Sequence, residues 1–71
     1  MSITFAVRGE YIQLDQLLKA TGLCSSGGEA HALIAEGRVR VDATVETRKR
    51  AKLRPGQQVT LAGETIALIA E

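Results

Sequence analysis

The hydrophobic period of this 71-residue chain switches from helical to strand-like near Gly37, and this switch sets the fold class. Before Gly37, apolar residues recur at helical spacing, as Leu14, Leu17 and Leu18 do. From Arg38 to Val41 polar and apolar residues alternate, which is typical of a half-buried strand. The pattern predicts an α+β fold in which two short helices pack against a small, mostly antiparallel sheet with a hairpin.

Capping signals bound both helices. The first is predicted from about Gln13 to Thr21, with Gly22 placed to end it in a left-handed conformation. Ser26-Gly27-Gly28-Glu29 has the S-x-x-E spacing of a capping box, so the second helix is expected to begin there. That helix should end at Gly37, and the short connection between the helices should force them together at an angle.

The remaining segments are expected to form short strands and turns. Strands are predicted at 3–7, 38–41, 44–46, 59–61 and 66–68. Asp42-Ala43 should form the hairpin turn, and Pro55-Gly56 fits a type II turn. Residues 47–52 have no apolar face, so we expect them to cross the surface as an extended arm.

Positive charge is concentrated in one segment, residues 37–54. It holds seven of the nine basic residues against two acidic ones, a local net charge of +5, whereas the rest of the chain carries −4. Such a cluster can produce a strongly positive local field, which favours a partner with several negative charges. The alternative is that the cations only form a solvated face.

Composition excludes several kinds of protein. The chain is expected to be one domain, 1–71, too small for a deep catalytic cleft, and it shows no nucleophile–base pair, so we do not expect an enzyme. Cys24 and His31 are the only cysteine and histidine, which excludes an internal disulfide and a four-ligand zinc site. Cys24 is interpreted as a structural loop thiol and His31 as a helix-surface residue.

Location and partners are also constrained. The apolar runs are too short to span a bilayer, and the start Met1-Ser2-Ile3-Thr4 lacks the features of an export signal, so the cytoplasm is the expected location. No cofactor, metal, membrane or small-molecule substrate is expected, and the chain is expected to be a monomer.

Several motifs together resemble a known family, the small RNA-binding domain named after small-subunit ribosomal protein four. The motifs are Leu14-Asp15-x-x-Leu18, Ser26, Ala30-x-x-Leu33-Ile34-x-x-Gly37-x-Val39-x-Val41 and Pro55-Gly56-Gln57-x-Val59. The tract Glu46-Thr47-Arg48-Lys49-Arg50, with Gly9-Glu10-Tyr11 upstream, further resembles the stand-alone bacterial YbcJ-like proteins. The resemblance implies an alpha-L motif-like fold and binding of structured RNA, ribosomal or transfer RNA, without catalysis.

The same resemblance implies that the helix pair and the following hairpin meet the RNA. The expected RNA-binding residues are Lys19, Ser26, Gly27, Arg38, Arg40, Arg48, Lys49, Arg50 and Lys52. Two positions depart from the family pattern. Gly27 stands where many relatives have an arginine, which removes one RNA contact. Asp42-Ala43 replaces the usual Asn-Gly, which should loosen the hairpin and bring an acid near the basic face.

Other interpretations remain open at this level. The basic arm could dock an acidic protein, which would make the chain an adaptor. Binding to DNA through a helix-turn-helix is disfavoured, because the second helix has no Arg, Asn or Gln to read base edges. Gly27-Gly28 could admit a phosphate to the helix start or simply give a flexible entry. Tyr11 is expected to pack at the start of the first helix rather than stack on a nucleotide.

Overall fold

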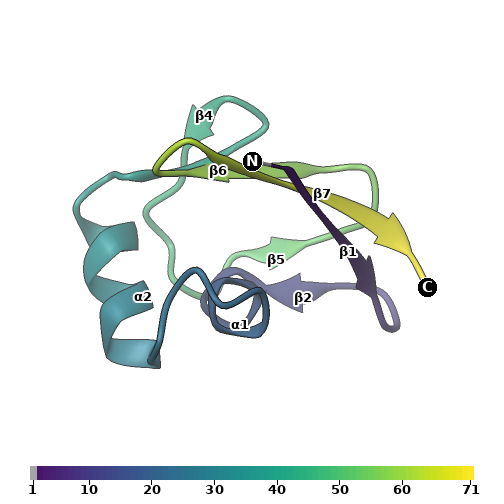
Figure 1. Cartoon of the computed structure of the whole chain (residues 1–71), viewed down its shortest axis with the longest axis horizontal. Coiled ribbons are helices and arrows are strands. Elements are labelled where there is room, and N and C mark those ends of the chain that lie inside the picture. The colour runs from purple at the N-terminus through teal and green to yellow at the C-terminus, as the bar shows by residue number, and fades with distance from the viewer. Residues whose placement is uncertain (1) are drawn as a thin grey trace.

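The fold has two layers, a five-stranded sheet and a layer of two helices with a small second sheet (Figure 1). It is seen in a computed structural model that describes residues 2–71. The elements are β1 (Ser2–Val7), β2 (Ile12–Gln13), α1 (Leu14–Ala20), α2 (Gly27–Ala35), β3 (Val39–Val41), β4 (Thr44–Val45), β5 (Lys52–Leu53), β6 (Gln58–Leu61) and β7 (Glu64–Ala70). This layout confirms the predicted α+β class.

The larger sheet has the strand order β1-β7-β6-β3-β4. Neighbouring strands are antiparallel from β7 to β4, whereas β1 pairs with β7 in parallel, Ser2 opposite Thr65 and Val7 opposite Ala70. Strand β2 pairs with β5 as a separate two-stranded sheet beside α1. The prediction of a mostly antiparallel sheet is therefore confirmed.

Both helices begin and end close to the predicted residues. Gln13 and Thr21 flank α1, and Gly22 has φ +81°, the left-handed conformation that glycine adopts without strain. The Ser26 hydroxyl accepts a hydrogen bond from the Glu29 N–H at 3.2 Å and caps α2. The Glu29 carboxylate, however, accepts from the Ser25 N–H at 2.9 Å, one residue earlier than a capping box requires.

The hairpin between β3 and β4 is tight, so the expectation that Asp42-Ala43 would loosen it was wrong. Val41 pairs directly with Thr44, and both turn residues have positive φ, 50° for Asp42 and 68° for Ala43, as a type I′ turn requires. The Asp42 carboxylate accepts the Gln58 N–H at 3.0 Å, and the Asp42 N–H donates to the Gln58 carbonyl at 2.9 Å. These bonds to β6 hold the turn despite the unfavourable backbone of Ala43.

The segment 47–52 is not a free arm across the surface. Ala51 is buried, and Lys52 belongs to β5, where it pairs with Gln13. The prediction failed because a two-residue strand and one small buried side chain leave no periodic signal in the sequence.

The type II turn at Pro55-Gly56 is confirmed, with Gly56 at φ +98° and the Gln57 N–H bonded to the Arg54 carbonyl.

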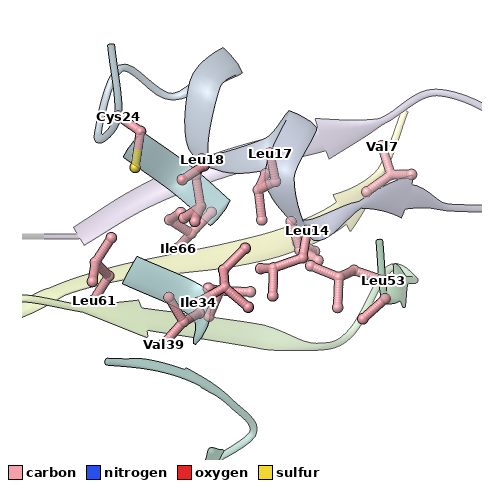
Figure 2. Packing of buried hydrophobic residues seen from close by; sticks show 14 residues of the cluster. Val7, Leu14, Leu17, Leu18, Cys24, Ile34, Val39, Leu53, Leu61 and Ile66 are labelled. Atoms are coloured by element: carbon pink, nitrogen blue, oxygen red, sulfur yellow. The ribbon is translucent and has the colours of Figure 1, made fainter. Parts of the chain in front are cut away.

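One hydrophobic cluster lies between the sheet and the helices (Figure 2). Leu14, Leu17 and Leu18 point from α1 toward side chains of the sheet, and Ile34 joins them from α2. Cys24, in the loop between the helices, is buried in this cluster; burial and the nearby Glu29 carboxylate raise the pKa of its thiol. None of the helices in residues 2–71 is long and apolar enough to cross a membrane.

Candidate nucleic-acid interface

The loop between β4 and β5, residues 46–51, carries Arg48, Lys49 and Arg50, and we call it the basic loop. It leaves the sheet at β4 and enters the helical layer beside α1 (Figure 1). Its backbone is bonded to the first turn of α1, because the Leu14 N–H donates to the Ala51 carbonyl and the Asp15 N–H donates to the Lys49 carbonyl, each at 3.0 Å. These carbonyls replace a side-chain cap, which Gln13 does not supply. The basic loop is thereby fixed to a helix.

Three of the predicted RNA contacts line one open hollow of about 430 Å³. The hollow is bounded by Arg48, Arg50, Ala51 and Lys52. Within residues 2–71, Lys49, Arg50 and Lys52 form no ion pair, so their charges are available to a ligand. A concave surface lined by cations attracts anions more strongly than the same charges spread over a flat face. We call this feature the basic hollow.

Arg48 is oriented by Glu46 within the same loop. Arg48 donates to the two Glu46 carboxylate oxygens from Nε and from its NH2 group, each at 3.1 Å, and its backbone N–H donates to Glu46 at 3.0 Å. These bonds lower the pKa of Glu46 below its ordinary value, so the pair is ionised at neutral pH. Arg48 is therefore held in place, but part of its charge is neutralised before any ligand arrives.

Tyr11 contacts Lys52, one of the residues that line the basic hollow. Its side chain is 38% exposed, and the Lys52 ammonium lies 5.0 Å from the centre of its ring. This cation–π contact holds Lys52 over the short β2–β5 sheet. Tyr11 directly precedes β2, which leads into α1 without a break.

Asp15 and His31 join the two helices next to the basic loop. The Asp15 carboxylate lies 2.9 Å from His31 Nε2 and also accepts the Gln16 N–H at 2.8 Å. Partial burial raises the pKa of Asp15, but the hydrogen bonds from His31 and Gln16 and the positive charges of His31 and Arg50 outweigh it and lower that pKa. Sequence reasoning missed this pair, since the two residues lie 16 positions apart and no local motif connects them.

Three more predicted contacts lie on the helices. Ser26 and Gly27 form the start of α2, and Ser26 Oγ is already used as the helix cap. A Cβ built on Gly27 would meet no atom within 4 Å, so the space above this turn is open. Lys19 is in the last turn of α1, one turn after Asp15 on the same side of the helix. These residues do not line the basic hollow.

Arg38 and Arg40 are not in the basic hollow. Arg38 donates from Nε to Glu36 at 2.8 Å and borders a different hollow of about 340 Å³, lined mainly by Leu23, Leu33 and Leu61. Arg40 alternates with the inward-facing Val39 on β3, so its side chain projects from the sheet face opposite the helices. The expected single face of nine contacts is thus divided, and the strongest local concentration of cations is around the basic loop.

No group of three or more His, Cys, Asp and Glu side chains in residues 2–71 is arranged to hold a metal ion. The candidate site consists of cations on a loop whose backbone is bonded to the first turn of a helix.

Comparison with known proteins identifies the class of this domain. The S4 domain family profile matches residues 5–69, which is nearly the whole chain. This chain therefore belongs to the S4 domain family. The family resemblance drawn from the helix and turn motifs is confirmed.

The chain covers most of the length of its YbcJ relatives but only a small part of a larger enzyme. The chain is 47% identical over 60 residues to "Putative RNA-binding protein YbcJ" of Escherichia coli (strain K12), covering 84% of this chain and 86% of that protein. The solution structure of YbcJ from E. coli has a TM-score of 0.70 and 40% identity, with 97% of this chain and 86% of that one covered. Its description is of an "alfaL" motif involved in RNA-binding. A tyrosine–tRNA ligase of Ralstonia nicotianae is 41% identical over 56 residues, 79% of this chain but 14% of the ligase.

Proposed function

We propose that this protein is a non-catalytic RNA-binding domain that holds structured RNA, such as ribosomal or transfer RNA, through the basic loop. The observation that carries the proposal is the basic hollow, in which Arg48, Arg50 and Lys52 surround one concavity and no ion pair within residues 2–71 occupies Arg50 or Lys52. The RNA-binding description of the YbcJ relatives supports it.

The chemistry of the side chains favours phosphate over base recognition. Arginine can hold a phosphate through two parallel hydrogen bonds, and A-form RNA is recognised largely through phosphates, 2′-hydroxyls and shape. Phe5 and Tyr11 are the only aromatic residues, and Phe5 packs against the core, so there is no platform on which successive bases could stack. Lys49 in the loop and Lys19, Ser26 and Gly27 on the helices would flank the bound backbone.

Three double variants with the same change of charge test this site. Arg48→Gln with Arg50→Gln removes two cations from the basic hollow, and Arg8→Gln with Arg54→Gln removes two from outside it. Against fluorescein-labelled transfer RNA at 0.1 M salt, the first pair should raise Kd by about 25- to 60-fold. The slope of log affinity against log salt is about 0.7–0.9 per phosphate contact, so each contact contributes roughly 0.7–0.9 log units at 0.1 M salt relative to 1 M. The second pair should leave Kd within about two-fold of wild type.

The third pair, Arg38→Gln with Arg40→Gln, decides whether the RNA extends beyond the basic loop. A loss as large as that of the first pair would move the main contact to the α2–β3 region. Equal small losses in all three pairs would reject a localised RNA site and leave only non-specific charge attraction. Thermal unfolding of each variant separates lost binding from lost folding.

The competing function is an adaptor whose basic loop docks an acidic protein. Affinity capture from cells before and after ribonuclease treatment distinguishes the two. Loss of all captured partners on digestion supports RNA as the ligand, and protein partners that survive digestion contradict it.

A further inference from the structure

We infer that Glu46 is a positioning residue for RNA binding, because it holds the Arg48 guanidinium in an orientation that leaves one edge open to a phosphate. An acidic side chain would thus strengthen the binding of a polyanion. The inference deepens the proposed function and rests on it. Charge alone gives the opposite expectation, since a carboxylate beside a phosphate site repels the ligand.

Glu46 is itself fixed to the sheet. It directly follows β4, and its backbone N–H donates to the Val39 carbonyl of β3 at 3.0 Å. The Glu46 side chain is only 18% exposed, whereas that of Arg48 is 79% exposed. The carboxylate is therefore a sheltered acceptor attached to the sheet, and the guanidinium that it holds extends into solvent, where a ligand can reach it.

The contact with Glu46 occupies only one edge of the guanidinium. Nε and Nη2 of Arg48 donate to the carboxylate oxygens Oε2 and Oε1, each at 3.1 Å. A guanidinium carries five N–H groups in a rigid planar fork, so three remain, and two of these lie in parallel along the end of the fork. Two parallel N–H groups can hold two oxygens of one phosphate. Arg48 can therefore bind Glu46 and a phosphodiester at the same time.

The effect of Glu46 is confined to Arg48 among the cations of the basic loop. The carboxylate also accepts the Arg48 backbone N–H at 3.0 Å. Hydrogen bonds from the Arg48 side chain and backbone lower the pKa of Glu46, and neither Lys49 nor Arg50 contributes to that shift. Arg50 lines the same hollow, but its guanidinium has no hydrogen-bonded partner within residues 2–71. Of the two arginines in the hollow, Arg48 is the one that is oriented in advance.

Such orientation reduces the conformational entropy that is lost on binding. Immobilising one long, flexible side chain at an interface weakens binding by about two- to ten-fold, and a side chain that is already held avoids most of this loss. The repulsion between Glu46 and a phosphate opposes the gain, but the carboxylate is shielded by the guanidinium edge that it binds. We therefore expect the orientation of Arg48 to outweigh the repulsion.

The sign of one substitution distinguishes the two effects. Glu46→Gln keeps the shape of the side chain but removes its charge and the paired acceptors. Against fluorescein-labelled transfer RNA at 0.1 M salt, it should raise Kd by about three-fold or more, whereas a purely electrostatic role would lower Kd. In the Arg48→Gln background, Glu46→Gln should leave Kd unchanged or lower it, because no guanidinium remains to be oriented. Glu10→Gln removes the same charge from an exposed acid outside the basic loop and should leave Kd within about two-fold of wild type.

A second measurement needs no RNA. The ¹⁵N relaxation of the arginine Nε–H groups should give Arg48 a higher order parameter than Arg50 in wild type, and Glu46→Gln should lower it to the level of Arg50. Thermal unfolding checks that the variants still fold.

Three results would overturn the inference while the RNA-binding function stands. They are a Glu46→Gln variant that does not raise Kd, an equal rise of Kd in both backgrounds, and an Arg48 guanidinium as mobile as that of Arg50 in wild type. If wild type does not bind the transfer RNA, the proposed function itself fails.

Discussion

The Asp15 N–H donates to the Lys49 carbonyl at 3.0 Å, and this bond makes the basic loop the cap of α1. One residue earlier, the Leu14 N–H donates to the Ala51 carbonyl at 3.0 Å in the same way. Unpaired N–H groups at a helix start carry partial positive charge. In α1, two of these groups are paired because they donate hydrogen bonds to carbonyls of the basic loop. The side chains of Lys49 and Arg50 consequently extend from a backbone that is fixed at both ends, by β4 and by α1.

Salt dependence measures how many phosphates this arrangement engages. If Arg48, Lys49, Arg50 and Lys52 each neutralise one phosphate, log affinity should fall with log salt at a slope of about −3 to −4. Arg48→Gln with Arg50→Gln should reduce the slope by about 1.5. Fluorescence anisotropy between 50 and 300 mM potassium chloride gives the slope, and a response close to zero would contradict phosphate recognition.

The hairpin turn predicts a stabilising substitution. Ala43 has φ +68°, a left-handed conformation that costs a residue with a Cβ roughly 1–2 kcal/mol. Ala43→Gly should therefore increase the free energy of unfolding by about 1 kcal/mol and raise Tm by roughly 4–8 °C. Circular dichroism on heating measures this shift. Ala32→Gly, at an exposed position in the interior of α2, is the matched control and should lower Tm, since glycine weakens a helix interior by about 0.5–1 kcal/mol.

Acid sensitivity should originate partly at Asp15. Its pKa is lower in the folded state than the ordinary value of 3.8, so its contribution to stability is complete above that value and is lost as pH falls below about 4. Asp15→Asn should lower the free energy of unfolding by about 1 kcal/mol at pH 6 and by much less at pH 2.5. Urea unfolding at both pH values measures the difference.

The exposed Glu10→Gln is the control for that experiment, and it should show no difference from wild type at either pH. A deficit of Asp15→Asn that stays constant across the pH range would mean that the carboxylate charge does not stabilise the contact with His31.

Local signals predicted the local features of the fold correctly. The leucine spacing at Leu14, Leu17 and Leu18 defined the buried side of α1, and Ser26 and Gly22 marked helix ends, because capping depends on residues only a few positions apart. The identity of the hairpin turn was also predicted. Its tightness was not, since the bonds that hold Asp42 come from Gln57 and Gln58, about 16 positions away.

Features that depend on distant contacts were not predictable from the pattern. The basic tract was recognised from its composition. Its attachment to the helical layer was not predicted, because it depends on the pairing of β5 with Ile12 and Gln13, and two-residue strands leave no periodic signal in the sequence. For the same reason, the sequence pattern placed Arg38 and Arg40 on one face with Arg48 and Arg50. In the structure, Arg48 and Arg50 line the basic hollow, whereas Arg38 borders a different hollow and Arg40 lies on β3.

The parallel pairing of β1 with β7 has a consequence for how the chain acquires its structure. Ser2–Val7 can join the sheet only beside residues 64–70, because β7 separates it from every other strand. During synthesis, β1 cannot form its strand pairing until residues 64–70 have emerged from the ribosome. Since such distant pairings slow folding, closure of β1 onto β7 is expected to be a late event.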